Sequence, residues 1–472
     1  MIHIKGINHY KRYSYRLTPG TPSLHNGHYS WSVHGDSHIE SSPEASDFIE
    51  IGKAIHLADR AIRRSGGAAS KYRNFEVTVP VHRTRRWKSQ TDLLESLAEF
   101  ATGDSWHIHF KPNTAKLTSV PKQNSADAST VALFSGGLDS LCGAAFLAKS
   151  GVSPLFVSHS PPGCESNKAF IDELYGAFGH QALNKERFIS FRLEIRQRDA
   201  KGEHSMFQEM SRRSRPFFFL SLATAVAIAK GIRTIQMSEN GALALSLPNR
   251  FDTHGPSIAR QAHSKIMEGF SHLVREICGP REVRNFVNPF ASMTKGDICG
   301  FLGPAKFLAR RSVSCEYVGH QKADLLRWQA DHPAAAKKRK MGHGPQCGLC
   351  YPCLVRRAAL WKAGIDDPTE DYFSDAAHVL RQSRKRGSAL KFFSGRITPP
   401  LLNSLASNPI YHERFSKNLI DMSVERFSWQ YLPQLRSVML PPGVKESVSL
   451  WSYNLMQRFA NEQLEFLNDA AP

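Results

Sequence analysis

The chain has 472 residues, enough for roughly two to four domains and a sizeable hydrophobic core. Apolar residues make up 41% of it and charged residues 22%, which excludes a chain that is disordered throughout. Lys and Arg number 61 against 42 Asp and Glu, so the net charge is +19. Such a charge favours an anionic partner, namely nucleic acid, a nucleotide or a membrane surface, although a solvated basic surface explains it equally well.

The sequence contains no run of the ~18 consecutive apolar residues that a membrane-spanning helix needs. Residues 217–229 come closest, and their length suits a buried helix instead. The first residues do not form the apolar core of a signal peptide. We therefore expect a cytoplasmic protein without a membrane partner, whose eight cysteines stay reduced and call for a metal or catalytic explanation.

Residues 1–125 predict an N-terminal α+β domain without recognisable catalytic chemistry. Alternating apolar residues indicate strands, and apolar residues at helical spacing indicate helices. The predicted strands are 29–33, 75–81 and 106–110, and the predicted helices are 48–64 and 91–100.

Residues 130–365 follow a small, polar linker at 122–129 and predict the catalytic domain. Short apolar runs alternate here with helical patterns, which is typical of an α/β fold with a doubly wound parallel sheet. The predicted strands are 130–134, 155–157, 188–193 and 232–237, and the predicted helices are 140–149, 169–178 and 217–229. Residues 366–472 predict a mainly helical C-terminal extension that packs on the core or contacts a partner.

A glycine-rich loop joins the first of these strands to the first helix. It reads Ser135-Gly136-Gly137-Leu138-Asp139-Ser140. The glycines let the backbone approach a ligand closely, and the free N–H groups at the start of a helix attract negative charge. The two serines add hydroxyl donors. Asp139 would repel a bare phosphate, so its presence suggests a Mg²⁺ ion that bridges the carboxylate and phosphate oxygens.

This loop has neither the Gly-Lys-[Ser/Thr] of a P-loop nor the Gly-x-Gly-x-x-Gly of a dinucleotide site. It resembles the Ser-Gly-Gly-x-Asp-Ser loop of the PP-loop ATP pyrophosphatases, whose fold is adenine nucleotide alpha hydrolase-like. The resemblance implies that residues 135–140 bind ATP. Such enzymes cleave ATP between the α- and β-phosphates, and a nitrogen or sulfur nucleophile then displaces the AMP. The alternative is a glycine turn with a capping side chain and no ligand.

Cysteines form the second strong motif. Cys347, Cys350 and Cys353 follow one another at two-residue spacing, and Cys315 supplies a fourth thiol upstream. Four thiolates favour a closed, structural zinc site. An iron–sulfur cluster and a redox-active cysteine pair are the alternatives.

The loop and the cysteines together resemble 7-cyano-7-deazaguanine synthase (QueC) and its relatives, over about residues 130–365. The segments 288–298 and 347–356 carry the same resemblance. It implies that the four cysteines hold Zn²⁺, that Asp139 and Ser140 act in catalysis, and that Lys295 is a cation near the ATP phosphates rather than a surface lysine. Family enzymes adenylate the carboxylate of 7-carboxy-7-deazaguanine, convert it to an amide with ammonia, and dehydrate the amide to a nitrile with a second ATP.

The segment that recognises the base departs from the family pattern. Asn240 fits the position of the family's Asn, but the Tyr-Pro-Asp that follows in the family is missing. Glu239 and Asp252 are then the candidates to read a guanine-like edge, because a carboxylate accepts from its N–H groups. Arg215 stands where the family has an Arg and is a candidate ligand for an anionic substrate. Turn, capping and salt-bridge roles are the alternatives for these residues.

The extensions at both ends look like those of the QueC-like proteins of bacterial antiphage operons, in the Qat system (QatC) and the type IV cyclic-oligonucleotide systems. In that group the activated carboxylate is thought to pass to a protein amine, so the resemblance implies a protein acceptor besides ATP, Mg²⁺ and Zn²⁺. The alternatives are the nitrile synthase itself, a tRNA-modifying PP-loop enzyme and a catalytically inactive nucleotide sensor. Basic runs at 337–340 and 381–386 suit nucleic acid, but such runs are more often solvated loops, so nucleic acid is not the favoured partner.

Overall fold

A computed structural model provides the structure of the chain. It describes residues 1–7, 12–17, 19–20, 29–34, 38–62, 73–121, 128–159, 166–181, 187–195, 209, 213–247, 260, 262–282, 284–315, 345–377, 379–381 and 408–470.

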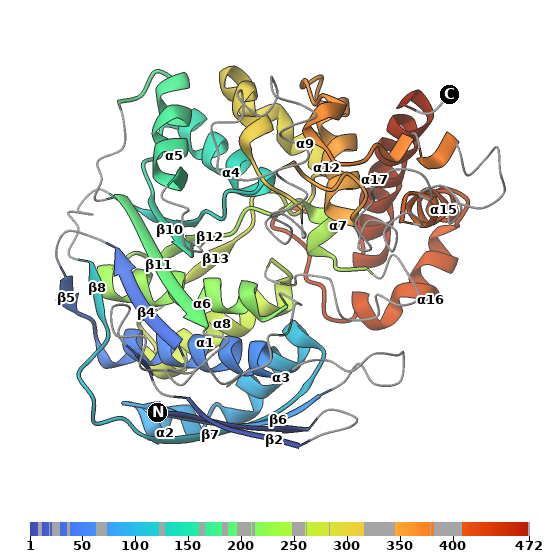
Figure 1. Cartoon of the computed structure of the whole chain (residues 1–472). Coiled ribbons are helices and arrows are strands. Elements are labelled where there is room, and N and C mark those ends of the chain that lie inside the picture. The colour runs from blue at the N-terminus through green and yellow to red at the C-terminus, as the bar shows by residue number, and fades with distance from the viewer. Residues whose placement is uncertain are drawn as a thin grey trace.

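A seven-stranded sheet lies at the centre of the molecule (Figure 1), with the strand order β13-β12-β9-β10-β11-β4-β3. Its strands are β3 (Pro19–Gly20), β4 (Tyr29–His34), β9 (Thr130–Leu133), β10 (Leu155–His159), β11 (Phe188–Ile195), β12 (Thr234–Gln236) and β13 (Asn285–Val287). The run from β13 to β11 is parallel throughout, which confirms the predicted α/β architecture with parallel strands.

The other edge of this sheet differs from the prediction. Strand β4 pairs antiparallel with β11, and β3 pairs parallel with β4, so the sheet is mixed rather than wholly parallel. The reason lies in the alternation of apolar residues along β4: Trp31 and Val33 pack against the core, and the Trp31 ring stacks on Phe191 of β11 at 5.4 Å. Residues near the N-terminus therefore extend the sheet that carries the glycine loop.

Helices cover both faces of the sheet (Figure 1). On one face lie α4 (Leu138–Lys149), α5 (Ser166–Ala177) and the 3-10 segment η4 (Gly300–Arg311), whose apolar side chains share a core cluster. On the other face lie α1 (Pro43–Ala61), α6 (Ser214–Lys230) and α8 (Ser264–Cys278), which share a second cluster. A parallel sheet is stable in this arrangement because neither of its faces meets water.

A second sheet backs the helices of that second face, with the order β2-β1-β6-β7. Its strands are β1 (Ile2–Ile7), β2 (Arg12–Leu17), β6 (Asn74–Val81) and β7 (Ser105–Pro112), and two short strands, β5 (His38–Glu40) and β8 (Ser119–Pro121), pair separately. Helices α2 (Thr84–Lys88) and α3 (Thr91–Thr102) follow in the same region. Helix α1 is buried along most of its length because it contacts both α6 and β6.

The predicted helix at 48–64 corresponds to α1, with shifted ends. It starts earlier, at Pro43, because the Ser42 hydroxyl accepts from the Ala45 N–H at 3.2 Å and proline suits the first helical position. Near its end, Asp59 accepts from the Ser214 N–H at 3.2 Å, at the start of α6, and pairs with the fully buried Arg73. The N-terminal residues are thus bonded to the helix that carries Arg215.

The described C-terminal residues are mostly helical, as their pattern predicts. The helices of this part and of the loops that face it are α7 (Gly241–Ala244), α9 (Lys295–Cys299), α12 (Tyr351–Lys362), η5 (Thr369–Asp371), α15 (Asn408–Ile420), α16 (Val424–Leu435) and α17 (Val448–Ala470). Helix α17 packs against α12, α15 and α16 and also reaches α7. Among the described residues, no helix is both long enough and apolar enough to cross a membrane.

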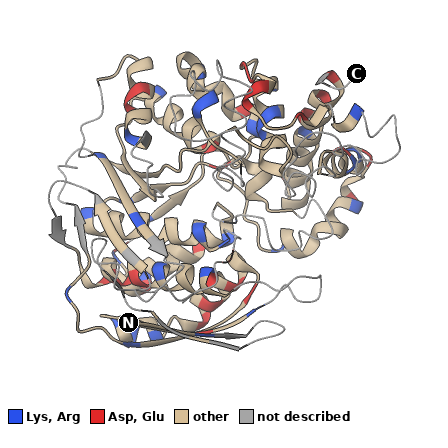
Figure 2. Ribbon diagram, viewed as in Figure 1, with Lys and Arg blue, Asp and Glu red and all other residues tan. Residues whose placement is uncertain are grey.

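Charged residues of both signs are spread over the ribbon (Figure 2). Lys and Arg lie on elements throughout the drawn part of the chain, interspersed with Asp and Glu. The basic run 337–340, most of the run 381–386 and most of the linker 122–129 lie outside the described residues.

Candidate active site and metal centre

A pocket of about 270 Å³ opens at the carboxyl end of β9, beside the glycine loop. It is lined by Leu133, Ser135, Gly137, Leu138, Asp139, Ser140, Arg215, Pro216, Phe219, Met237, Ser238, Glu239, Leu243, Lys295, Ser314 and Pro352. In open α/β sheets ligands bind at this edge. The structure thus brings together residues that the sequence singled out in segments more than a hundred positions apart.

The glycine loop turns sharply from β9 into α4. Gly136 has a φ of +78°, and a Cβ atom there would lie 2.9 Å from the Asn167 Oδ1, so the position requires glycine. Gly137 precedes the first residue of α4, and no side chain caps this helix terminus. The Ser140 hydroxyl donates to the Gly137 carbonyl at 2.9 Å and lies 3.3 Å from the Ser135 hydroxyl. The helix start therefore presents backbone N–H groups and hydroxyls suited to an anion.

Asp139 is held between two neighbours across the pocket. Its Oδ1 lies 3.0 Å from the Lys295 ammonium, and its Oδ2 accepts from the backbone N–H of Asn240 at 3.2 Å and from the side-chain amide of Asn240 at 2.8 Å. The side chain of Lys295 is 5% exposed, so Lys295 is not the surface lysine that the sequence left open as an alternative. Asn240 also caps α7, because its Oδ1 accepts from the Leu243 N–H at 3.2 Å.

Glu239 is a buried carboxyl group in the wall of the pocket. Burial, and next the charge of Asp139, raise the pKa of Glu239 to about 8. Its Oε2 makes no hydrogen bond within the described residues. Asn288 fixes its backbone, because the Asn288 amide donates to the Glu239 carbonyl at 2.8 Å and accepts from the Glu239 N–H at 3.3 Å. A buried carboxyl oxygen that lacks a hydrogen-bond partner, beside a cavity, suits a ligand that carries N–H donors.

Arg215 lies in the first turn of α6 and lines the same pocket. Its guanidinium stands 5.0 Å from the centre of the Phe219 ring. The other candidate for reading the base, Asp252, lies outside the described residues.

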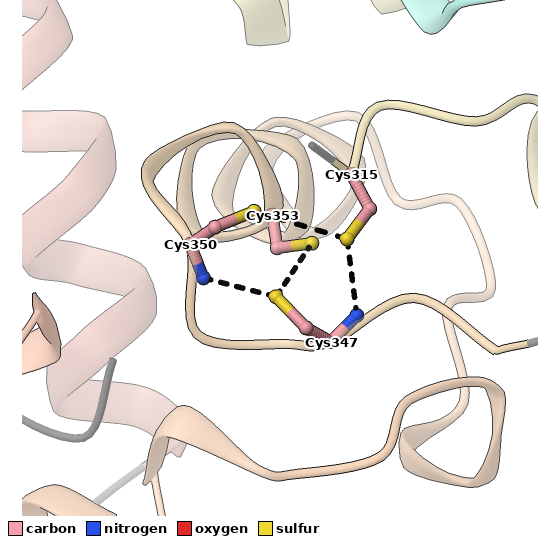
Figure 3. Close-up of side chains that lie close together, drawn as sticks. All are labelled: Cys315, Cys347, Cys350 and Cys353. Carbon is pink, nitrogen blue, oxygen red and sulfur yellow. Dashed lines mark hydrogen bonds between the residues drawn. The ribbon is translucent and has the colours of Figure 1, made fainter. Parts of the chain in front are cut away.

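The four cysteines meet in a buried cluster (Figure 3). Their sulfur atoms all lie within 4.8 Å of one another, with 3.8 Å between those of Cys347 and Cys353 and 4.0 Å between those of Cys315 and Cys350. Zn–S bonds of about 2.3 Å in a tetrahedron separate the sulfurs by roughly 3.8 Å, so the donor set and its spacing fit one zinc ion. The atoms of an iron–sulfur cluster would lie between the four cysteine sulfurs and hold them farther apart than one zinc ion does.

The backbone around the cluster is shaped for thiolate ligands. The N–H groups of Leu349 and Cys350 donate to the Cys347 sulfur at 3.4 and 3.2 Å, which stabilises negative charge there. Gly348 has a φ of +80°, and a Cβ atom on it would lie 1.9 Å from the Ser374 carbonyl oxygen, so this turn requires glycine. The Cys-Gly-Leu-Cys motif thus needs its glycine to form this turn.

The cysteine cluster adjoins the pocket wall. Ser314, which lines the pocket, precedes Cys315, and the Val313 N–H donates to the Gly136 carbonyl of the glycine loop at 3.1 Å. Pro352, which stands between Cys350 and Cys353 in the sequence, also lines the pocket, from the first turn of α12. A metal held by the four thiols would therefore fix this wall relative to the glycine loop, and none of the thiols would be left for chemistry.

Sequence reasoning missed residues that hold the site from elsewhere in the chain. Glu462 of α17 contacts the start of α9 beside Lys295, and Asn288 holds Glu239. Asn288 begins the segment that carried the family resemblance, so a signal existed for it. No pattern in the sequence marks Glu462, because a single glutamate in a helix is ordinary.

No family model matches this chain. The 7-cyano-7-deazaguanine synthases of Brucella ovis, Brucella canis and Brucella suis are 30% identical to it over 139 residues, which is 28% of this chain and 54% of each relative. The chain therefore spans about half the length of the curated relatives that it matches. This distant similarity supports the resemblance to QueC-like enzymes.

Proposed function

We propose that this protein is an ATP-dependent, AMP-forming enzyme that activates the carboxylate of a 7-carboxy-7-deazaguanine-type base and transfers it to an amine. The observation that carries the proposal is the pocket in which the glycine loop, Lys295, Arg215 and Glu239 meet. The similarity to 7-cyano-7-deazaguanine synthases supports the substrate class.

The reaction has two steps. In the first, a carboxylate oxygen of the substrate attacks the α-phosphorus of ATP, and pyrophosphate leaves. The start of α4, the two serine hydroxyls and the Lys295 ammonium would bind the departing phosphates and offset their charge. In the second, an amine nitrogen attacks the carbonyl carbon, loses a proton, and expels AMP.

Glu239 would read the base through its free oxygen, and Arg215 would pair with the substrate carboxylate. Asp139 is the carboxylate beside the glycine loop that would hold Mg²⁺, an ion that neutralises phosphate charge when bound. The Lys295 ammonium lies 3.0 Å from the Asp139 Oδ1, so Lys295 would also help to offset phosphate charge beside this carboxylate. Zinc in the cysteine cluster would have a structural role only.

We propose a protein amine as the acceptor, in antiphage defence, because described N- and C-terminal segments contact the elements that build the pocket. A macromolecular acceptor needs a docking surface, which such segments can provide. The second candidate is synthesis of the nitrile from ammonia, and the activity named for the Brucella relatives favours it.

The first test measures release of AMP and pyrophosphate from ATP with and without 7-carboxy-7-deazaguanine. We expect the acid to stimulate release, and Asp139→Ala to lower it by at least about a hundredfold because the variant loses the carboxylate that orients Lys295 and the metal. Asp92→Asn, at an exposed position of α3, is the control and should behave as wild type. No stimulation by the acid would refute the substrate class.

The second test identifies the acceptor. The protein, ATP and the deazaguanine acid are incubated with the proteins encoded beside it, and intact masses are recorded. A gain on one partner equal to the acid minus water supports the protein acceptor. Free nitrile formed from ammonia, with no partner modified, supports the second candidate.

A further inference from the structure

The first turn of α9 is held by a carboxylate from near the far end of the chain. Glu462, on α17, is 3% exposed. Its Oε2 accepts from the Thr294 hydroxyl at 2.7 Å, and the Gly296 N–H donates to its two oxygens at 3.2 and 3.1 Å. Thr294 and Gly296 are the two neighbours of Lys295 in the chain, so one carboxylate accepts from a side-chain hydroxyl before that lysine and from a backbone N–H after it.

Gly296 makes this contact possible. A Cβ atom at that position would lie 2.5 Å from the Glu462 Oε2, which is closer than two such atoms can stand. Thr294 and Asp297 complete the turn with a capping box, in which each side chain accepts from the backbone N–H of the other. The glycine after Lys295 and the glutamate on α17 therefore form a fitted pair.

Apolar side chains also dock α17 on the neighbouring helices. Leu455, Phe459 and Ala460 of the same helix lie in an apolar cluster with residues of α16 and α7. Burial raises the pKa of Glu462 to about 7, so the site bears a desolvation cost that an apolar side chain would avoid. The contact with the start of α9 is what the glutamate adds.

We propose that Glu462 is a positioning residue for Lys295, by which the C-terminal extension sets the place of the pocket's ammonium group. The inference rests on the proposed function in one respect, namely that Lys295 binds phosphate.

The test measures binding of magnesium pyrophosphate to the full chain by isothermal titration calorimetry, without turnover. Glu462→Gln should weaken binding about tenfold, because the amide loses an acceptor oxygen of the charge-assisted bonds that fix the turn. If Glu462→Gln only removed a negative charge near Lys295 and left the lysine in place, pyrophosphate would bind more tightly. The direction of the change in affinity therefore separates a loss of positioning from a loss of charge. Gly296→Ala should weaken pyrophosphate binding similarly, because the added Cβ pushes the Glu462 carboxyl away from the start of α9.

Two variants of α17 serve as controls. Glu465→Gln changes a half-exposed glutamate of the same helix, and Tyr453→Phe removes the hydrogen bond from Tyr453 to the Met422 carbonyl at 2.9 Å, away from α9. Both should bind pyrophosphate as wild type does. If Glu462→Gln and Gly296→Ala bind pyrophosphate as tightly as the controls, Glu462 does not position Lys295, while the proposed function stands. If wild-type protein binds neither pyrophosphate nor ATP, both proposals fall.

Discussion

Glu239 shows how strongly the fold alters the chemistry of a single residue. Its carboxyl is buried in the pocket wall with a raised pKa of about 8, so at neutral pH it holds a proton that an exposed glutamate would release. The resemblance to a family could name Glu239 as a candidate. Its burial could not be predicted, because the residues that enclose it come from distant segments such as Asn288 and Asp139.

The raised pKa predicts how stability depends on pH. The folded state keeps the Glu239 proton up to about pH 8, whereas the unfolded state releases it near the ordinary value of 4.5, so native stability falls as pH rises through this interval. Glu239→Gln carries no titrating proton at this position, so its stability should not fall for this reason as pH rises. Relative to wild type, the variant should therefore gain on the order of a few kcal/mol in free energy of unfolding between pH 5 and pH 8.

Urea unfolding at both pH values measures this difference. Glu268→Gln, at an exposed position of α8, should show no such change and is the control. A difference between Glu239→Gln and wild type that is the same at pH 5 and pH 8 would contradict the proposed ionisation.

Close contact between elements explains why the pocket has a fixed shape. Helix α4 approaches the loop after β12 so closely that a Cβ atom on Gly143 would lie 2.0 Å from the Ser238 hydroxyl oxygen. The same loop carries Glu239 and Asn240. The helix that begins at the glycine loop is therefore in direct contact with the segment that faces it across the pocket.

Gly143→Ala should force these elements apart. We expect a loss of about 1–3 kcal/mol in free energy of unfolding and a lower rate of ATP-dependent AMP release, because the loop must move together with Glu239 and Asn240. Gly176→Ala in α5 is the matched control: a Cβ atom there has no neighbour within 4 Å, so it should raise stability by up to ~1 kcal/mol and leave the rate unchanged. Equal behaviour of the two variants in denaturation and rate assays would contradict the contact.

The sequence located several of the elements but not all of their partners. Apolar runs located the strands β9, β10 and β11, and helical spacing located α1 and α3, with ends that differ by a few residues. The alternation in β4 predicted a strand, yet nothing local could show that it joins the sheet that carries the glycine loop, because pairing depends on β11 far along the chain. Local pattern decides the kind of element, and tertiary packing decides its neighbour.

At the scale of the whole molecule, the cysteine cluster connects the pocket wall to the helices that follow it. Cys315 comes directly after the pocket residue Ser314, while Cys350 precedes α12 and Cys353 lies within it. The two-residue spacing of three cysteines, with Cys315 as a fourth thiol upstream, predicted that the four would meet, and the structure confirms the buried cluster. The contact of Val313, two residues before Cys315, with Gly136 of the glycine loop had no signal in the sequence.

Metal analysis tests the cluster. We expect about one zinc per chain, and Cys353→Ser should release it, lower the melting temperature and weaken ATP binding, because the wall beside the glycine loop loses its anchor. Cys278→Ser, at the half-buried end of α8, should keep both metal and affinity. Iron in place of zinc in elemental analysis of the purified protein would overturn the assignment.

Pairing of β4 with β11 also sets the order in which the chain can fold during synthesis. His34 pairs with Ser190, so the two strands are about 150 positions apart. At roughly 5–20 residues per second, the ribosome needs roughly 8–30 seconds to deliver the second strand after the first. Until then β4 has an unpaired edge and its apolar face is uncovered. Strand β4 thus precedes the parallel strands of the central sheet in the chain and can enter the sheet only once β11 has followed, so a chaperone that shields nascent strands would act on it during that interval.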